Sequence, residues 1–466
     1  MDMLYESPPE GEGPLVAVPG PHLTVDNLAL ADTRGVEVFG GVLGGAPSFT
    51  LEALDLGLRL WGSRERFRLM AVGCQGELDA RTGRPVDWTE RLRALEERGI
   101  GYLLHVHEGE YATTYSGLQL PLGPIIWFLE DPLEPGKPAS YQRANSHVPE
   151  LLASRDGLLG EETLVLVEPQ PPDSELELIK IARDGGSAYT VMVIDVYARY
   201  EEYRPYMIEI KKCMRGALLF DANEKELVAL AGRQAEDGIL LDDVEECIAK
   251  FSYEVLTLAT LGPFGNAVAY KGEVAATPSL LKRPPGDFLA RASCALRALP
   301  SLLDPRVRRE RMSIFRLRAK GLVNTCGAGD CSKGLALAKV LSDAREWGWD
   351  GYEFRKVLEY VPLDEYDYLV EISRAANVGG RFTLDRVGAF SSPPLSRLES
   401  LLRKASEMPS FHSVAELVRY GEETRGLSRS LILDPPRPSE VLLEEFHAML
   451  ERNLGALRRL GDQRGE

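Results

Sequence analysis

The sequence lacks several patterns that would assign it to a common class. Its six cysteines contain no C-x-x-C pair, so neither a zinc ribbon nor a disulfide framework is indicated. There is no run of about 18 apolar residues, and Met1–Met3 does not open a charged-then-apolar leader. The 54 Lys and Arg residues against 71 Asp and Glu give a net charge of −17, which argues against a nucleic-acid polymer as the main partner. We therefore expect a cytoplasmic protein with no membrane-spanning segment.

Short apolar segments alternate along the chain with helix-forming stretches. Leu164–Val167 and Val191–Asp195 indicate strands, and Glu175–Arg183 between them indicates a helix. Strand–helix–strand alternation predicts a parallel sheet covered by helices, that is, an α/β fold. The 466 residues, of which 44% are hydrophobic and 27% charged, have an ordinary globular composition and can bury a large core.

A turn of small residues, Gly327-Ala328-Gly329, stands between an apolar run and the helix-forming stretch Leu335–Leu341. Glycines let the backbone approach an anion closely, and a helix that begins there points free N–H groups at it. Asp330 would lie at the helix start. There it could cap the helix, or it could take a proton from an attacking hydroxyl, and the residues alone leave both roles open.

The segment Val323–Gly334 resembles the second signature of the ribokinase (PfkB) family of small-molecule kinases, D-T-x-G-A-G-D. The resemblance implies that residues 327–329 form the anion hole for the transferred phosphoryl group and that Asp330 is the catalytic base. The P-loop pattern is absent, so Lys333 has no Walker role. Asn324 stands where the family has an Asp tied to its monovalent-cation site, so the resemblance does not imply potassium activation. Leu335 replaces a small residue, so helix packing there is expected to differ.

Further matches concern the nucleotide. Asn223 and Glu226 fit the family's N-x-x-E motif, which implies that Glu226 acts through water on the Mg²⁺ that bridges the ATP phosphates. The same two residues also fit a helix N-cap and capping box, and that interpretation stays open. Thr260 and Gly262 match a Thr-Leu-Gly segment expected to contact the nucleotide. Asn377 lies in a stretch resembling the family's last helix, which implies a place at the adenine pocket.

Matches on the acceptor side are looser. Gly20 and Asp26 fit the family's Gly-x-x-x-x-Asp with one extra residue between them, which implies that Asp26 binds acceptor hydroxyls, although a turn residue is the alternative. Gly44 and Gly45 belong to a glycine cluster resembling the first signature, where the backbone touches the substrate. Phe49 replaces the family's Asn there, and its ring could stack a base.

The resemblance covers roughly residues 14–395 and implies a ribokinase-like, doubly wound, mainly parallel sheet flanked by helices, with a small β lid. We expect a kinase domain over residues 14–405, with lid strands at about 27–45 and 100–128. Residues 406–466 are expected to form a helical C-terminal extension with a long amphipathic segment, Pro438–Leu460.

The activity implied by the resemblance is ATP- and Mg²⁺-dependent transfer of the γ-phosphoryl group to a hydroxyl of a small sugar, polyol or nucleoside. The alternative is a ribokinase-like pseudokinase that acts as a binding or regulatory scaffold, suggested by the altered first signature, by Asn324 and by the insertions. The expected partners are ATP and a small hydroxyl acceptor, and a homodimer stays open.

His105 and His107 alternate within Tyr102–His107, a segment that predicts a strand. Side chains two positions apart on a strand face the same way, so the two imidazoles are expected on one face. A metal site needs at least a third ligand. The sequence offers none nearby, so the pair alone does not predict a metal site.

Overall fold

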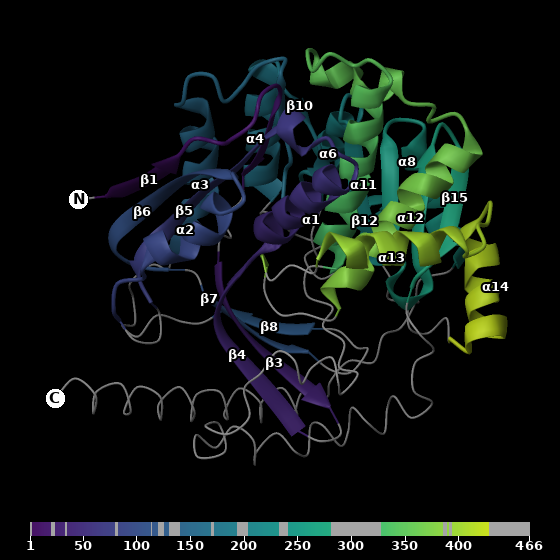
Figure 1. Ribbon diagram of the computed structural model, residues 1–466, viewed down its shortest axis with the longest axis horizontal. Helices are drawn as coiled ribbons and strands as arrows, with labels where there is room; N and C mark the ends of the chain where they lie inside the picture. Colours follow the sequence, from purple (N-terminus) through teal and green to yellow (C-terminus); the bar gives the residue numbers. More distant parts are fainter. Residues whose placement is uncertain are drawn as a thin grey trace.

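A large sheet lies between two layers of helices in the computed structural model of the chain, and a smaller sheet projects from one side (Figure 1). The structure describes residues 2–19, 24–32, 35–79, 83–112, 114–119, 125–129, 140–168, 172–192, 204–232, 241–280, 328–384, 389–390 and 394–427. Within these ranges, residues 24–32, 35–44, 114–119, 125–129 and 140–146 are described by their backbone only.

The large sheet consists of a six-stranded and a five-stranded part that continue one another. Residues on either side of Thr190 form the last strand of the first part and the first strand of the second, and the Thr190 N–H donates to the Val165 carbonyl at 3.1 Å. Pairing is parallel except at the two edges, where the first strand and the last two strands are antiparallel. The strand order of the six-stranded part is β1 (Met3–Ser7), β6 (Gly101–Tyr111), β5 (Arg68–Leu78), β2 (Leu15–Pro19), β9 (Thr163–Val165) and β10 (Ala188–Tyr189). The order of the five-stranded part is β11 (Val191–Met192), β12 (Leu219–Asn223), β13 (Leu256–Thr260), β14 (Gly265–Tyr270) and β15 (Glu273–Pro278).

Both faces of this sheet are buried. Along β2, Leu15 and Ala17 belong to one hydrophobic core and Val16 and Val18 to the other, as expected for a parallel strand covered on both sides. The predicted α/β class, a mainly parallel sheet flanked by helices, is confirmed. The first core packs under α3 (Ser140–Ala153), α4 (Pro172–Asp184), α6 (Met207–Met214), α7 (Glu224–Leu230), α8 (Leu241–Ser252) and α14 (Val414–Arg425); the second packs under α1 (Ala46–Leu60), α2 (Trp88–Glu96), α11 (Ala328–Glu346) and α12 (Tyr366–Thr383), and α13 (Leu395–Ser406) lies on α12 and α1.

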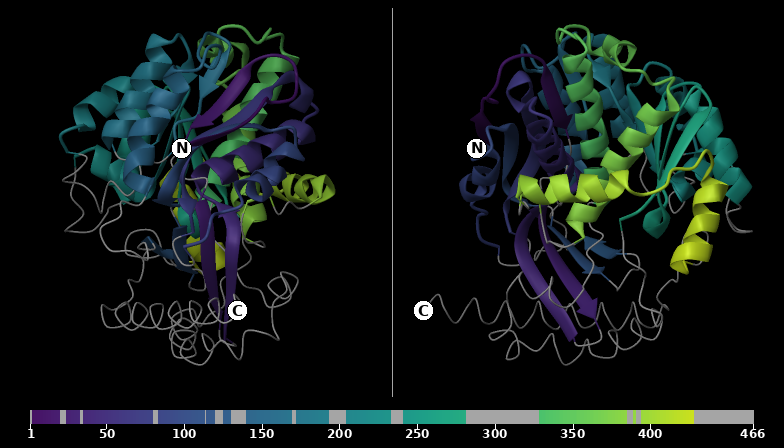
Figure 2. Two further views of the ribbon diagram at one scale, coloured as in Figure 1. Left: turned by 90° about the vertical axis from the view of Figure 1, so that its left-hand side faces the viewer. Right: turned by 45° about the vertical axis from the view of Figure 1, so that its right-hand side comes forward.

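Four strands form the smaller, projecting sheet: β3 (Thr24–Asp32), β4 (Gly35–Gly44), β7 (Thr114–Gln119) and β8 (Ile125–Leu129). Their order is β4-β3-β7-β8, with β3 and β7 parallel and the outer pairs antiparallel. The sheet extends away from the helices in each view of the molecule (Figure 2). It is the predicted lid, and it lies outside the large sheet.

The predicted lid range 100–128 is wrong in its first part. Residues 101–111 form β6, which pairs in parallel with β5 inside the large sheet. The reason is burial: Leu103 faces one core and Leu104 the other, and a strand that is apolar on both faces belongs in the middle layer of an α/β fold. The second pair of lid strands therefore begins only at Thr114.

The chain beyond residue 405 also packs on the large sheet as far as the structure describes it. Phe411 exchanges two backbone hydrogen bonds with Ala276 of β15, at 2.8 and 2.9 Å, and Leu417 of α14 lies in the same core as α8. The predicted helix Pro438–Leu460 lies outside the described residues. Three short 3-10 helices, Arg64–Arg66, Gly262–Phe264 and Phe354–Tyr360, complete the elements among the described residues. Among the described helices, none is long and apolar enough to cross a membrane.

Candidate active site

Two helices begin side by side at the place where the glycine-rich signature ends. A Cβ built on Gly334 of α11 would lie 2.7 Å from the Ala53 Cβ of α1, and one built on Gly57 of α1 would lie 2.5 Å from the Ala338 Cβ of α11. Contacts that advance together along both helices mean that α1 and α11 run in the same direction. Their N-terminal ends, which carry partial positive charge and free N–H groups, therefore lie at the same end of the molecule.

The start of α11 is also held by α12 at very short range. A Cβ on Gly379 of α12 would lie 2.1 Å from the Cys331 carbonyl oxygen, a backbone atom that cannot move aside. The glycine therefore permits a contact between two helix backbones directly behind Asp330.

Replacing Gly379 should consequently destabilise the protein, whereas replacing its neighbour should not. We expect Gly379→Ala to lower the free energy of unfolding by about 1–3 kcal/mol through overpacking. Gly380→Ala is the control: its Cβ would meet the Ser332 Oγ at 2.9 Å, a side-chain atom that can rotate away, and the Ala328 carbonyl oxygen at 3.6 Å, an ordinary van der Waals contact. Denaturant unfolding of both variants measures the difference, and equal stabilities would contradict the close approach of α12 to α11.

The signature residues themselves are accessible at this end. Ala328, Gly329 and Asp330 form the first turn of α11 and are half-buried. A Cβ built on Gly329 would meet no described atom within 4 Å, so the space above the turn is open among the described residues. Gly327 lies outside the described residues, so its predicted place in the anion hole stays a prediction. An open turn of small residues at a helix start is suited to holding an anion.

One turn after Asp330, Lys333 is completely buried. Its Nζ donates to Oε2 of Glu168 at 2.8 Å and lies 3.2 Å from the Met192 sulfur. Glu168 lies just beyond the carboxyl end of β9, and Met192 is the last residue of β11. The first turn of α11 thus sits at the carboxyl ends of the parallel strands, which is where open α/β sheets bind ligands.

Several acidic groups surround this lysine. Burial raises the pKa of Asp330 to about 7, with the Glu168 carboxylate adding to the rise and Lys333 opposing it. Burial likewise raises the pKa of Asp221, two residues before the end of β12, to about 7 against the effect of Lys333. Burial opposes the charge on Lys333, but Glu168, Asp221 and Asp330 together hold its pKa above the usual value. A carboxyl group with a pKa near neutrality is suited to accept a proton.

The same cluster has the donor atoms that a hard cation requires. Glu168 Oε1 and Asp221 Oδ1 are buried and have no hydrogen-bond partner within the described part of the chain. Carboxylate oxygens of this kind are the ligands that Mg²⁺ prefers, so these two residues fit a magnesium ion bound together with phosphate groups.

Sequence reasoning missed Glu168, Asp221 and Lys333. The signal was present for the two acids, because each directly follows an apolar run and lies near the carboxyl end of a strand. For Lys333 the signal was its spacing, since residues three apart on a helix lie on the same face, which places it beside Asp330.

Asn223 and Glu226 form the capping box that the sequence allowed. Asn223 Oδ1 accepts from the backbone N–H groups of Lys225 and Glu226, both at 3.0 Å, and the Asn223 N–H donates to Glu226 Oε2 at 2.8 Å. The capping interpretation is thus confirmed, and the proposed action on Mg²⁺ stays a prediction. Asn223 pairs with Thr260 across β12 and β13, so both residues lie at the carboxyl ends of neighbouring strands.

The other two predicted nucleotide contacts differ in their surroundings. Gly262 adopts a left-handed conformation (φ 52°), and a Cβ there would meet no described atom within 4 Å, so its backbone is exposed beside Thr260. Asn377, by contrast, is 5% exposed, and its amide donates to the Thr277 carbonyl and hydroxyl at 3.0 and 2.7 Å. These bonds join α12 to β15, a packing role that the family resemblance did not imply.

The predicted acceptor residues lie where the lid joins the body. Asp26 is in β3, opposite Val42 of β4, and its side chain lies outside the description. Gly44 ends β4, and Gly45 precedes α1 with φ 81°. The expectation that Phe49 stacks a base is wrong: the ring is 2% exposed and packs between α1, α11 and α12 in an apolar cluster.

Comparison with solved structures identifies the architecture. No protein-family model matches the sequence, and no curated protein matches it. The ribokinase of Giardia lamblia is 16% identical over 84% of this chain and 99% of that chain, with a TM-score of 0.55. The fructokinase of Xylella fastidiosa, solved with bound ATP, is 13% identical over 84% and 99%, with a TM-score of 0.51. The fructokinase of Vibrio cholerae O395, solved with fructose, ADP and calcium, is 15% identical over 84% and 99%, with a TM-score of 0.50.

Proposed function

We propose that this chain, which has the ribokinase-like fold, is a kinase that transfers the γ-phosphoryl group of ATP to a hydroxyl of a small sugar, polyol or nucleoside. The observation that carries the proposal is the place of Asp330, at the start of α11, beside an open glycine and at the carboxyl ends of the parallel strands. Its raised pKa, about 7, suits a group that must take a proton from an alcohol.

The mechanism follows from the groups around Asp330. Asp330 would orient the acceptor hydroxyl and receive its proton, while the N–H groups at the start of α11 would face the transferred phosphoryl group. Asp221 and Glu168 would hold Mg²⁺, which neutralises charge on the ATP phosphates when bound. Lys333 acts as a positioning residue, because its Nζ is bonded to Glu168 and its charge keeps the pKa of Asp330 from rising further.

The nucleotide is proposed to lie over the ends of β12 and β13, against Asn223, Glu226, Thr260 and Gly262. We leave Asn377 out of this set because its amide is committed to Thr277. The acceptor is proposed to lie at the lid, near Asp26, Gly44 and Gly45, because Gly45 leads directly into α1, whose start adjoins that of α11.

A panel of sugars, polyols and nucleosides, each incubated with the protein, ATP and Mg²⁺, tests the proposal. We expect ADP and a phosphorylated product, identified by mass spectrometry, for at least one compound. Binding of ATP without transfer to any member would favour the pseudokinase alternative. The raised pKa of Asp330 makes pH 8 the appropriate condition, since its carboxylate predominates there.

Glu226→Gln separates the two roles of Glu226. Glutamine can still accept the hydrogen bond of the capping box, so stability should change little, whereas the negative charge is lost. If Glu226 acts on metal-bound water, the Mg²⁺ concentration for half-maximal rate should rise by about 10–100-fold. Glu226→Ala, which also removes the cap, is the comparison for stability. An unchanged Mg²⁺ dependence in Glu226→Gln would leave Glu226 as a capping residue alone.

A further inference from the structure

Histidines gather at one edge of the large sheet, away from the start of α11. The chain has six histidines, and three of them, His105, His107 and His147, lie together. His105 and His107 are on β6, and His147 is on α3, which covers that face of the sheet. Asp2, just before β1, reaches the same point from the neighbouring antiparallel strand.

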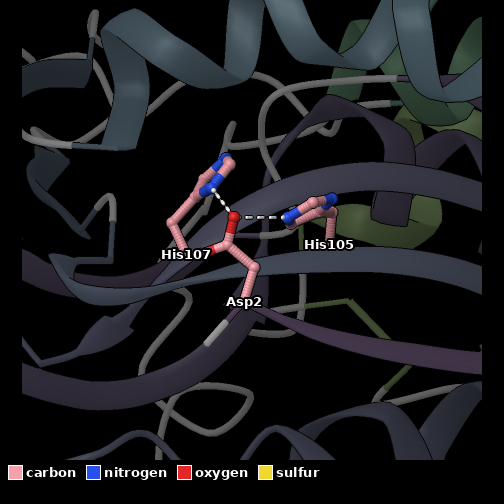
Figure 3. Close-up of side chains that lie close together, drawn as sticks. All are labelled: Asp2, His105 and His107. Atoms are coloured by element: carbon pink, nitrogen blue, oxygen red, sulfur yellow. Dashed lines mark hydrogen bonds and ion pairs between the residues drawn. The ribbon is translucent and has the colours of Figure 1, made fainter.

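Two imidazoles converge on a single carboxylate oxygen (Figure 3). His105 Nε2 lies 3.1 Å and His107 Nδ1 3.4 Å from Asp2 Oδ2. One ligand atom from each of the three residues falls within 4.8 Å of the others. The ring of His147 stands edge-on to that of His107, with centroids 4.8 Å apart, and supplies a third imidazole beside the cluster.

The cluster of Asp2, His105 and His107 is buried on one side and exposed to solvent on the other. His107 is 1% exposed, and its Nε2 is buried without a hydrogen-bond partner among the residues described. Asp2 is 51% exposed, which leaves an entry from solvent. A buried ring nitrogen without a partner calls for a polar group or a metal ion that the described residues do not supply.

We propose that Asp2, His105 and His107 form a binding site for a divalent transition-metal ion of the Zn²⁺ class, with His147 as the fourth ligand. Imidazole nitrogens and one carboxylate make up a donor set typical of zinc, and a hard cation such as Mg²⁺ is disfavoured because it requires mainly oxygen ligands. The pair of histidines that the sequence shows lacks a third ligand, and the fold supplies it as Asp2, the residue before β1.

A metal bound here would join three segments that are distant in sequence. β6, which carries His107, leads into lid strand β7, and α3, which carries His147, follows lid strand β8. The ion would therefore connect the two segments that flank these lid strands. Through Asp2 it would also hold β1 on the edge of the sheet. A metal ion that binds the folded chain and not the unfolded chain stabilises the fold in proportion to ln(1 + [metal]/Kd). The melting temperature should therefore rise with metal concentration. This site is independent of the proposed kinase activity.

The test uses the full chain with no histidine tag, stripped with a chelator and desalted. Three measurements are made on wild type, Asp2→Asn, His107→Asn and His147→Asn. They are calorimetric titration with Zn²⁺, the metal content after desalting, and the visible spectrum of the Co²⁺-loaded protein. His412→Asn is the matched control, because His412 also lies beside a carboxylate, 3.6 Å from Glu273 Oε1, but on another part of the surface.

We expect one Zn²⁺ per wild-type chain and the intense d–d bands of tetrahedral Co²⁺. Loss of a ligand should raise the Kd for Zn²⁺ more than about tenfold, because loss of even a group that only hydrogen-bonds to a ligand has an effect of this size. Asp2→Asn keeps the test decisive if His107→Asn fails to fold, because Asp2 is exposed. His412→Asn should bind like wild type. Absence of stoichiometric Zn²⁺ in wild type, or unchanged binding in Asp2→Asn, would overturn the proposal and leave only hydrogen bonds between Asp2 and the histidines.

Discussion

Asp330→Asn should reduce kcat by about 10²–10⁴-fold while leaving ATP affinity close to that of wild type, because it removes a positioned base and little else. Asparagine has nearly the same shape as aspartate and can occupy the same first turn of α11. Glu346→Gln, in the last turn of the same helix and exposed, is the control and should keep wild-type kcat. Steady-state rates on the best acceptor, together with calorimetric ATP binding, measure both effects. A kcat within a few-fold of wild type would remove Asp330 from the mechanism.

The pH dependence gives this prediction a second measurement. The folded-state pKa of Asp330 is about 7, so its carboxyl is protonated below that pH and cannot accept the hydroxyl proton. We expect kcat/KM of wild type to fall as pH decreases through about 7. Because Asp221 and Glu168 interact with Asp330, the apparent pKa of this limb belongs to the cluster. The residual activity of Asp330→Asn should lack the steep limb.

Lys333→Met should destabilise the fold by about 3–5 kcal/mol, because removal of one partner leaves the buried Glu168 carboxylate without its counter-ion. Both side chains are fully buried, and they form an ion pair with each other at 2.8 Å. Lys212→Met is the control: Lys212 forms an ion pair with Glu209 at 2.7 Å, but both are more than half exposed, so the cost should be about 0–1 kcal/mol. Denaturant unfolding measures both costs.

The double variant Lys333→Met, Glu168→Gln distinguishes a lost ion pair from a packing defect. If the uncompensated charge causes the loss, the double variant should recover much of the stability of wild type. A double variant no more stable than Lys333→Met would mean that the lysine stem, rather than its charge, holds the site. In Lys333→Met the acid limb of kcat/KM should move to higher pH, since Lys333 lowers the pKa of Asp330.

The fold could be predicted from the sequence wherever local pattern decides. Buried strand segments such as Leu164–Val167 and the glycine-rich start of α11 are visible without a structure. The division between lid and body was less predictable, because β6 and β7 are both strands and only burial on two faces assigns β6 to the large sheet. Phe49 was misjudged for a related reason: an aromatic residue beside a glycine cluster can face a ligand or the core, and packing decides.

The site residues that the sequence did not yield depend on contacts distant in sequence. Lys333 and Glu168 are 165 residues apart, and only the packing of α11 across the strand ends joins them. Asp2 and His105 meet because β1 pairs with β6 as an antiparallel strand at the sheet edge, and no local pattern in the sequence indicates this pairing. Asn377 shows the opposite case, in which a match to a family motif pointed to a ligand but the amide is used within the fold.

The most direct test of the proposed kinase activity is a transfer assay at pH 8. It follows the radiolabelled γ-phosphoryl group of ATP into the phosphate ester of the best acceptor. We predict that wild type and Glu346→Gln form one ester per ADP, and that Asp330→Asn, at equal ATP occupancy, forms about 10²–10⁴-fold less in the same time. Wild-type protein that binds ATP but forms no ester with any sugar, polyol or nucleoside would contradict the claim.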